Sequence, residues 1–286
     1  MSKRTLTNLL LLTVIGLLVL FVWLEPGQQA PDKTKLTDLD LASVSQIRIS
    51  RGNGRPIVLL RDDRGWQMQT PFITAANPQR VQELLSLLGL AVHNRFPVAE
   101  RQLQQYGLAT PGLSIDFGHD VVLVFGDSEP LGKQRYVLFN EHIHLVTDTV
   151  YQQLSSTDTY LIDTRPLANS PPITGLQLPD LALQQDDNGT WLRNGEPADD
   201  ADAINRFIDN WQHARALFVS RPLDAQPEAQ QQVRVLFGNG TQRSFILQQP
   251  KTGMSLIDTQ TGLRYLFTPD SAEQLLQLPA ATAPQQ

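Results

Sequence analysis

Histidines are the first residues in this sequence whose type and spacing could support chemistry. His142 and His144 alternate on a predicted strand and therefore point to one face of it, and His119 lies on a neighbouring segment. A structural metal site needs further ligands at fixed spacing, usually in tetrahedral geometry. The sequence supplies no such spacing and contains no cysteine. We therefore predict no metal site and interpret these histidines as solvated or hydrogen-bonded strand residues.

A glycine-rich segment from Gly126 to Gln134 resembles a phosphate-binding loop at first sight. In such a loop four residues separate the glycines, and a Ser or Thr follows the lysine to hold Mg²⁺. Here five residues separate Gly126 from Gly132, and Gln134 follows Lys133. The segment therefore favours a hairpin between two strands, and no cofactor is predicted.

Acidic clusters also have a structural interpretation. Asp62-Asp63 and Asp186-Asp187 each precede a glycine between predicted strands, where turn formation explains them. The acidic run from Asp199 to Asp202 lacks the spacing of a calcium loop and suits a helix N-terminus. Trp66 and Trp191 are expected to pack in the core rather than line a ligand groove. No catalytic, cofactor-binding or metal-binding residue is predicted, which favours a non-enzymatic protein.

Composition excludes several classes of protein. The chain has 286 residues, 41% of them hydrophobic, enough for one large domain or two ordinary domains. Its formal net charge of −6 is a poor match to a nucleic acid, so no nucleic-acid partner is expected. The absence of cysteine excludes disulfides, thiolate metal sites and a lipidated N-terminal cysteine.

The N-terminal segment predicts a membrane anchor. Twenty uncharged residues lie between Arg4 and Glu25, and as a helix they would span about 30 Å. A cleaved signal peptide usually has a shorter apolar core and a small-residue cleavage site, which Gln28-Gln29-Ala30 does not match. We predict a cytoplasmic stub (residues 1–5), a transmembrane helix (residues 6–24) and a tether (residues 25–42). The long domain that follows is expected in the periplasm of a bacterium, with residues 6–24 in the inner membrane.

The remaining sequence predicts one α+β unit used twice. Period-two apolar runs with Asp/Gly turns indicate short antiparallel strands, and Asn77-Pro78 begins an amphipathic helix. The pattern recurs in the second half at nearly constant offsets, with Val81, Leu84, Leu85 and Leu88 matched by Ile204, Phe207, Ile208 and Trp211, and Leu113, Ile115 and Phe117 by Val233, Val235 and Phe237. We predict two tandem repeats of an antiparallel-sheet-plus-helix unit, residues 43–166 and 167–279, with a flexible tail at 280–286.

Several of these motifs resemble the bacterial domain of unknown function 4340. The resemblance rests on Gly65-Trp66 followed by Pro71, the capped helix with Val81, Leu84 and Leu85, and the segment Tyr106-Gly107-Leu108-Ala109-Thr110-Pro111. It is clear from Val44 to Leu154 and weak in the second half. Members of that family are single-pass envelope proteins, often associated with gliding-motility-type ABC transporters, and have no assigned reaction. The resemblance therefore implies an ABC-system accessory role and supplies no catalytic residues.

Two functions from different classes follow from these patterns. The first is a non-enzymatic, membrane-anchored periplasmic accessory protein of an ABC-type envelope transport system, with a permease or auxiliary subunit as its partner. The second is an envelope-remodelling enzyme or glycan-binding module that uses the cleft between the two repeats. Converging carboxylates or histidines in that cleft would favour the second.

Overall fold

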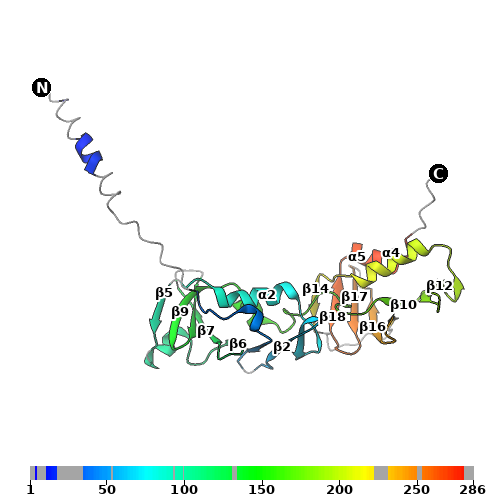
Figure 1. Cartoon of the computed structure of the whole chain (residues 1–286), viewed down its shortest axis with the longest axis horizontal. Helices are drawn as coiled ribbons and strands as arrows, with labels where there is room; N and C mark the ends of the chain where they lie inside the picture. Colours follow the sequence, from blue (N-terminus) through cyan, green and yellow to red (C-terminus); the bar gives the residue numbers. More distant parts are fainter. Residues whose placement is uncertain are drawn as a thin grey trace.

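Two nine-stranded antiparallel sheets with their helices form the folded body of the protein. The computed structural model describes residues 4, 11–17, 35–52, 54–92, 94–98, 100–130, 134–221, 231–249 and 253–279. The two units lie side by side along the longest axis of the molecule (Figure 1). The predicted α+β class and the repetition of one sheet-plus-helix unit are confirmed.

The first unit contains all strands up to β9. Its elements are η1 (Leu41–Ser43), β1 (Gln46–Ser50), β2 (Ile57–Asp62), β3 (Gly65–Thr70), β4 (Thr74–Ala75), α2 (Pro78–Ser86), η2 (Leu87–Gly89), β5 (Asn94–Pro97), η3 (Glu100–Tyr106), β6 (Leu113–Asp116), β7 (Val122–Ser128), β8 (Gln134–Phe139), β9 (His142–Thr147) and α3 (Tyr151–Ser156).

The second unit repeats that series without the short 3₁₀ helices. Its elements are β10 (Ile173–Leu178), β11 (Leu181–Gln185), β12 (Trp191–Arg193), β13 (Glu196–Pro197), α4 (Ala201–Gln212), β14 (Phe218–Ser220), β15 (Gln231–Phe237), β16 (Gln242–Gln248), β17 (Met254–Asp258), β18 (Arg264–Phe267) and α5 (Pro269–Leu276).

Strand order shows how closely the units correspond. The first sheet has the order β4-β3-β2-β1-β6-β7-β8-β9-β5, and the second has the order β13-β12-β11-β10-β15-β16-β17-β18-β14. Each strand of one sheet thus has a counterpart at the same place in the other. The helices correspond as well, since α2 and α4 follow the fourth strand and α3 and α5 follow the ninth.

Period-two burial explains why each sheet has a core face. In β1, Ile47 and Ile49 are fully buried while Arg48 between them is exposed. In β15, Val233 and Val235 are buried while Arg234 is exposed. This alternation is typical of an antiparallel sheet with one face against helices and one face open to solvent.

Helix α2 begins where the sequence predicts it. The side-chain oxygen of Asn77 accepts hydrogen bonds from the backbone N–H groups of Gln79 (3.0 Å) and Arg80 (3.2 Å), and Pro78 is the first helical residue. Val81, Leu84 and Leu85 are buried on the side of the helix that faces the sheet. The cap and the apolar stripe together fix α2 on the first sheet.

The N-terminal predictions fall mostly on residues outside the described part of the chain. Residues 11–17 are helical with exposed side chains, and no described helix is long and apolar enough to span a membrane. Most of the predicted stub, span and tether, and the whole predicted tail, lie outside the described residues. At the end of the predicted tether, Leu36 N–H donates to the Leu90 carbonyl (3.0 Å), and Thr37 N–H donates to that of Leu88 (3.1 Å).

Candidate functional site

The segment between the two units, residues 157–172, is hydrogen-bonded to both of them, and we call it the connector. On the side of the first unit, Asp163 N–H donates to the Ala75 carbonyl (2.9 Å), and Asn77 N–H donates to the Leu161 carbonyl (2.8 Å). On the side of the second unit, Ala216 N–H donates to the Thr164 carbonyl (2.9 Å). The connector therefore acts as a short strand-like bridge between the units rather than as a free linker.

An ion pair joins the connector to the second unit. The buried carboxylate of Asp158 pairs with the guanidinium of Arg221, which directly follows β14 and also lies over the Phe72 ring of the first unit (5.4 Å). Burial works against the charged form of Asp158, but hydrogen bonds and attraction from Arg221, with a contribution from Arg51, outweigh it and lower the pKa of this carboxyl. Asp158 is therefore an ionised acceptor at neutral pH.

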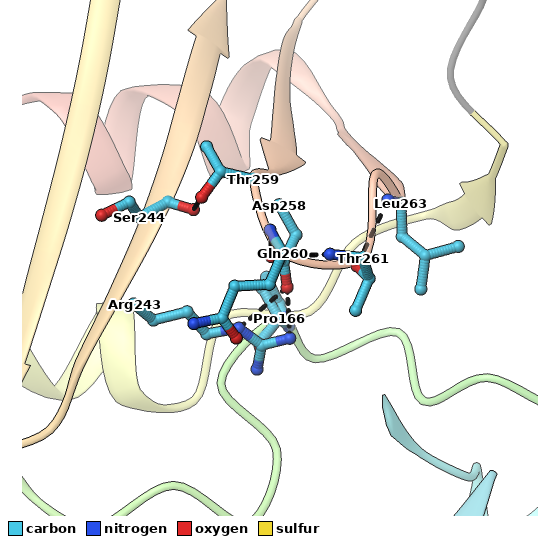
Figure 2. A network of polar contacts seen from close by, with 8 residues as sticks. All are labelled: Pro166, Arg243, Ser244, Asp258, Thr259, Gln260, Thr261 and Leu263. Carbon is cyan, nitrogen blue, oxygen red and sulfur yellow. Dashed lines mark hydrogen bonds and ion pairs between the residues drawn. The ribbon is translucent and has the colours of Figure 1, made fainter. Parts of the chain in front are cut away.

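A second ion pair, this one within the second unit, also contacts the connector (Figure 2). Asp258, at the end of β17, is fully buried and accepts a hydrogen bond from Arg243 Nε (2.9 Å). Its other carboxylate oxygen accepts the backbone N–H of Gln260 (2.8 Å). Arg243 Nη1 in turn donates to the Pro166 carbonyl of the connector (2.5 Å). Arg243 thus links β16, β17 and the connector.

Tyr265 of β18 completes the contacts between the units. Tyr265 is 1% exposed, and its hydroxyl lies close enough to the side chain of Thr74, on β4 of the first unit, for the two to interact. Burial raises the pKa of Tyr265, so this phenol stays protonated at neutral pH. This contact therefore joins the two units directly and not only through the connector.

The chemistry of this junction follows from its charge pairs. Each of its buried carboxylates, Asp158, Asp163 and Asp258, has an arginine partner, and Asp163 pairs with Arg165 at 2.7 Å. A general acid or base needs a proton that it can exchange near neutral pH and access to a substrate. Carboxylates held by arginines are suited to joining elements instead. The carboxylates that meet between the repeats therefore have the geometry of a structural clamp.

His119, His142 and His144, the histidines considered as metal ligands in the sequence, do not form a ligand cluster among the described residues. The rings of His142 and His144 lie 6.2 Å apart, and His119 Nε2 lies 3.4 Å from the Ser43 carbonyl instead. In the described part of the chain, no three His, Cys, Asp or Glu side chains are placed to hold a metal ion. The prediction that His144 is a hydrogen-bonded strand residue is confirmed, since its Nε2 atom lies 3.3 Å from the carbonyl oxygen of Phe139.

His144 should make stability depend on pH. Burial lowers the pKa of His144 from its ordinary value of 6.5, and the nearby Arg95 and His142 lower it further. When pH falls below about 6.5, unfolded chains take up a proton at this residue while folded chains do not, so stability falls. We expect His144→Gln to show a flatter decline between pH 6.5 and 5, measured by thermal unfolding. Between pH 7 and 8 the two profiles should run parallel, and equal slopes below pH 6.5 would contradict this assignment.

The remaining candidates from the sequence are turns, caps and core residues. Gly126 and Gln134 belong to β7 and β8, which pair antiparallel, so the predicted hairpin is confirmed, while Lys133 lies outside the described residues. The carboxylates of Asp62 and Asp186 accept backbone N–H groups within their turns. At the start of α4, Asp200 pairs with Arg193.

The two tryptophans differ in their degree of burial. Trp191 is buried, and its Nε1 donates to Asn205 (2.7 Å) on α4. Trp66 is half-buried and packs against the core. The prediction that Trp191 belongs to the core is therefore confirmed, and Trp66 lies at the margin of the core.

The segment Tyr106-Gly107-Leu108 packs the 3₁₀ helix η3 against the first sheet. The Tyr106 ring lies between those of Phe96 (5.5 Å) and Tyr136 (4.6 Å), and Leu108 is buried. Gly107 has a φ of +67°, a left-handed conformation that allows the chain to leave η3. This motif therefore has a structural role.

Comparison with known protein families gives a match that includes the connector. A family model described as "Domain of unknown function (DUF4340)" matches residues 66–233, from β3 to β15. The match thus covers more than half of the chain and includes the connector. No curated protein and no solved structure gives a significant match.

Proposed function

The chain belongs to the DUF4340 family, and on this premise we propose that it is a membrane-anchored periplasmic accessory protein of an ABC-type envelope transport system. It acts by binding a protein partner or the transported substrate, without catalysis. Its partner is a permease or an auxiliary subunit of the transporter. The resemblance of its motifs to single-pass envelope proteins associated with such transporters supports the choice of partner.

The observation that carries the proposal is the apolar N-terminal segment. No charged residue occurs between Arg4 and Glu25. Residues 11–17 are helical, and their apolar side chains are exposed, with Leu12 69% and Leu17 61% accessible. A helix with apolar side chains on all sides is stabilised by lipid rather than by water. This supports a span over residues 6–24.

The place where the chain joins the folded body supports a short tether. Lys35 forms an isolated bridge with Ala91, so the body begins beside the end of α2 and η2 in the first unit. Between Leu24 and Lys35 an extended chain reaches at most about 40 Å. A tether of this length keeps both units at high effective concentration near a membrane partner.

The junction supports action by binding over a broad surface. Connector hydrogen bonds, two arginine–carboxylate pairs and the Tyr265–Thr74 contact hold the two units together. The body can therefore present both sheets to a partner without first ordering one unit against the other, which lowers the entropy lost on binding.

Co-purification from native membranes tests the proposal. The full-length protein, extracted in mild detergent, is expected to recover an ABC permease and its ATPase, identified by mass spectrometry. A matched version carrying an unrelated transmembrane helix in place of residues 6–24 shows whether the span or the folded body makes the contact. Recovery of the protein alone from both preparations would contradict the accessory role and favour an envelope enzyme or glycan-binding module.

Reporter fusions test the topology separately. Alkaline phosphatase fused after Gln286 is expected to be active, because the enzyme matures in the periplasm, and a fluorescent cytoplasmic reporter at the same place is expected to be dark. The same reporters fused to a version without residues 6–24 provide the control and should reverse the pattern. A bright fluorescent fusion and an inactive phosphatase on the full-length chain would overturn the periplasmic assignment.

A further inference from the structure

A polar hollow of about 320 Å³ lies on the first unit, outside the junction. It is lined by Ser45, Gln46, Arg48, Asp116, Phe117, Gly118 and His119. These residues come from the start of β1, from β6 and from the turn between β6 and β7. Because Arg48 is exposed between the buried Ile47 and Ile49, the hollow lies on the open face of the sheet.

Two charged groups in the hollow have unused hydrogen-bonding capacity. Arg48 lies opposite Asp116 in the β1–β6 register, but within the described residues it forms no ion pair or hydrogen bond. One carboxylate oxygen of Asp116 accepts the Gly118 N–H (2.8 Å), and the other has no donor among those residues. The guanidinium fork and one carboxylate oxygen are thus available to a ligand.

The equivalent position in the second unit has different residues, and we compare them with those that line the hollow. Phe117-Gly118 and Phe237-Gly238 lie in equivalent turns of the two units, so Leu236 corresponds to Asp116. Gly175, the register partner of Leu236, corresponds to Arg48. Leu236 lies over Gly175, where an added Cβ would be 2.9 Å from the leucine Cδ1. The corresponding place in the second unit is therefore apolar and filled, so the fold does not require the polar groups.

Backbone conformation adds an independent observation. His119 (φ +53°) and Asp120 (φ +60°) both have left-handed conformations, which are unfavourable for residues with a Cβ. The equivalent turn, closed by the same hydrogen bond between Phe237 N–H and the Thr241 carbonyl (3.0 Å), has only Gly240 in that region. The hairpin can thus be built without two left-handed residues in succession, and in the first unit His119 of this turn lines the hollow.

We propose that this hollow binds an acidic sugar. The carboxylate of the sugar pairs with the guanidinium of Arg48, and its hydroxyls donate to the free oxygen of Asp116 and exchange hydrogen bonds with Gln46. The volume lies at the lower end of the range for small-molecule sites, which suits one sugar unit. The inference goes beyond the accessory role and is independent of the transporter partner.

Ligand-observed saturation-transfer NMR on the full chain tests this site. The protein is held in an amine-oxide detergent, which has no sugar headgroup, and the probes are sodium glucuronate, glucose and sodium acetate. We expect transfer to glucuronate at least fivefold above that to glucose, with acetate a weak competitor. Arg48→Ala should remove this preference. Arg234→Ala, which removes an exposed arginine from β15 of the second unit, should leave it unchanged.

Three outcomes would overturn the proposal. The first is no saturation transfer to glucuronate in the unmodified protein, and the second is equal transfer to glucuronate in Arg48→Ala. The third is displacement of glucuronate by acetate at concentrations as low as those at which glucuronate itself binds, because the site would then recognise only a carboxylate. His119→Gly gives a second check, because glycine accepts the left-handed conformation. The substitution removes the imidazole from the lining of the hollow, so it should weaken saturation transfer to glucuronate while the thermal midpoint stays the same or rises. A lowered midpoint with unchanged transfer would contradict the role of this turn.

Discussion

Replacing Arg243 by methionine is expected to lower the free energy of unfolding by about 3 kcal/mol. Asp258 is fully buried, and Arg243 is the cation that compensates its charge. Removing one partner of a buried pair leaves an uncompensated charge, which costs far more than the loss of an exposed pair. The same substitution breaks the hydrogen bond to the Pro166 carbonyl, so it also loosens the connector.

Denaturant unfolding followed by tryptophan fluorescence measures this loss, since Trp211 is buried in the second unit. The matched control is Arg64→Met, which breaks an exposed pair with Asp62 (3.1 Å; side chains 68% and 39% exposed) and should change stability by less than about 0.5 kcal/mol. The double variant Arg243→Met with Asp258→Asn should be more stable than the single variant, because it removes the unpaired charge. A loss below about 1 kcal/mol for Arg243→Met would contradict the assignment.

Replacing Gly126 by alanine is expected to cost about 2–3 kcal/mol. Gly126 is buried in β7, and a Cβ there would clash with the Tyr106 carbonyl and lie 2.9 Å from Leu108 Cγ. Because the clash involves backbone, it can be relieved only by moving η3 away from the sheet. That movement would disturb the packing of Tyr106 between Phe96 and Tyr136.

Gly89→Ala is the matched control for Gly126→Ala. A Cβ at Gly89 meets no atom within 4 Å, and its φ is not positive, so stability should stay within about 0.5 kcal/mol or rise slightly. Thermal unfolding of the two variants beside the unmodified protein measures the difference. Equal midpoints for both alanine variants would show that η3 does not depend on close approach at Gly126.

Much of each unit could be predicted because its signals are local. Alternation of buried Ile47 and Ile49 with Arg48 identifies a strand, and the Asn77 cap with Val81 and Leu84 identifies a helix. The repeat was visible because Ile204 and Phe207 continue the same spacing in α4. Each of these signals depends on residues a few positions apart, which share one backbone element.

The contacts at the junction could not be predicted in the same way. Asp158 and Arg221 are 63 residues apart, and Pro166 and Arg243 are 77 residues apart. An isolated aspartate in a loop has the same sequence signature whether water or an arginine surrounds it. Which group surrounds it depends on the path that the connector takes between the two sheets. No periodic pattern in the sequence predicts that path.

The hollow on the first unit also combines features that local sequence predicts with features that only tertiary structure decides. The sequence places Arg48 on the open face of a strand and Gly118 in a turn, and both follow from local periodicity. Only the pairing of β1 with β6 brings Arg48 opposite Asp116 and the turn with His119 beside them. Local sequence therefore determined the elements of this protein and their repetition, because propensity and burial act over neighbouring residues. Tertiary structure decided which charges are paired and which stay available, because that depends on strands brought together from distant parts of the chain.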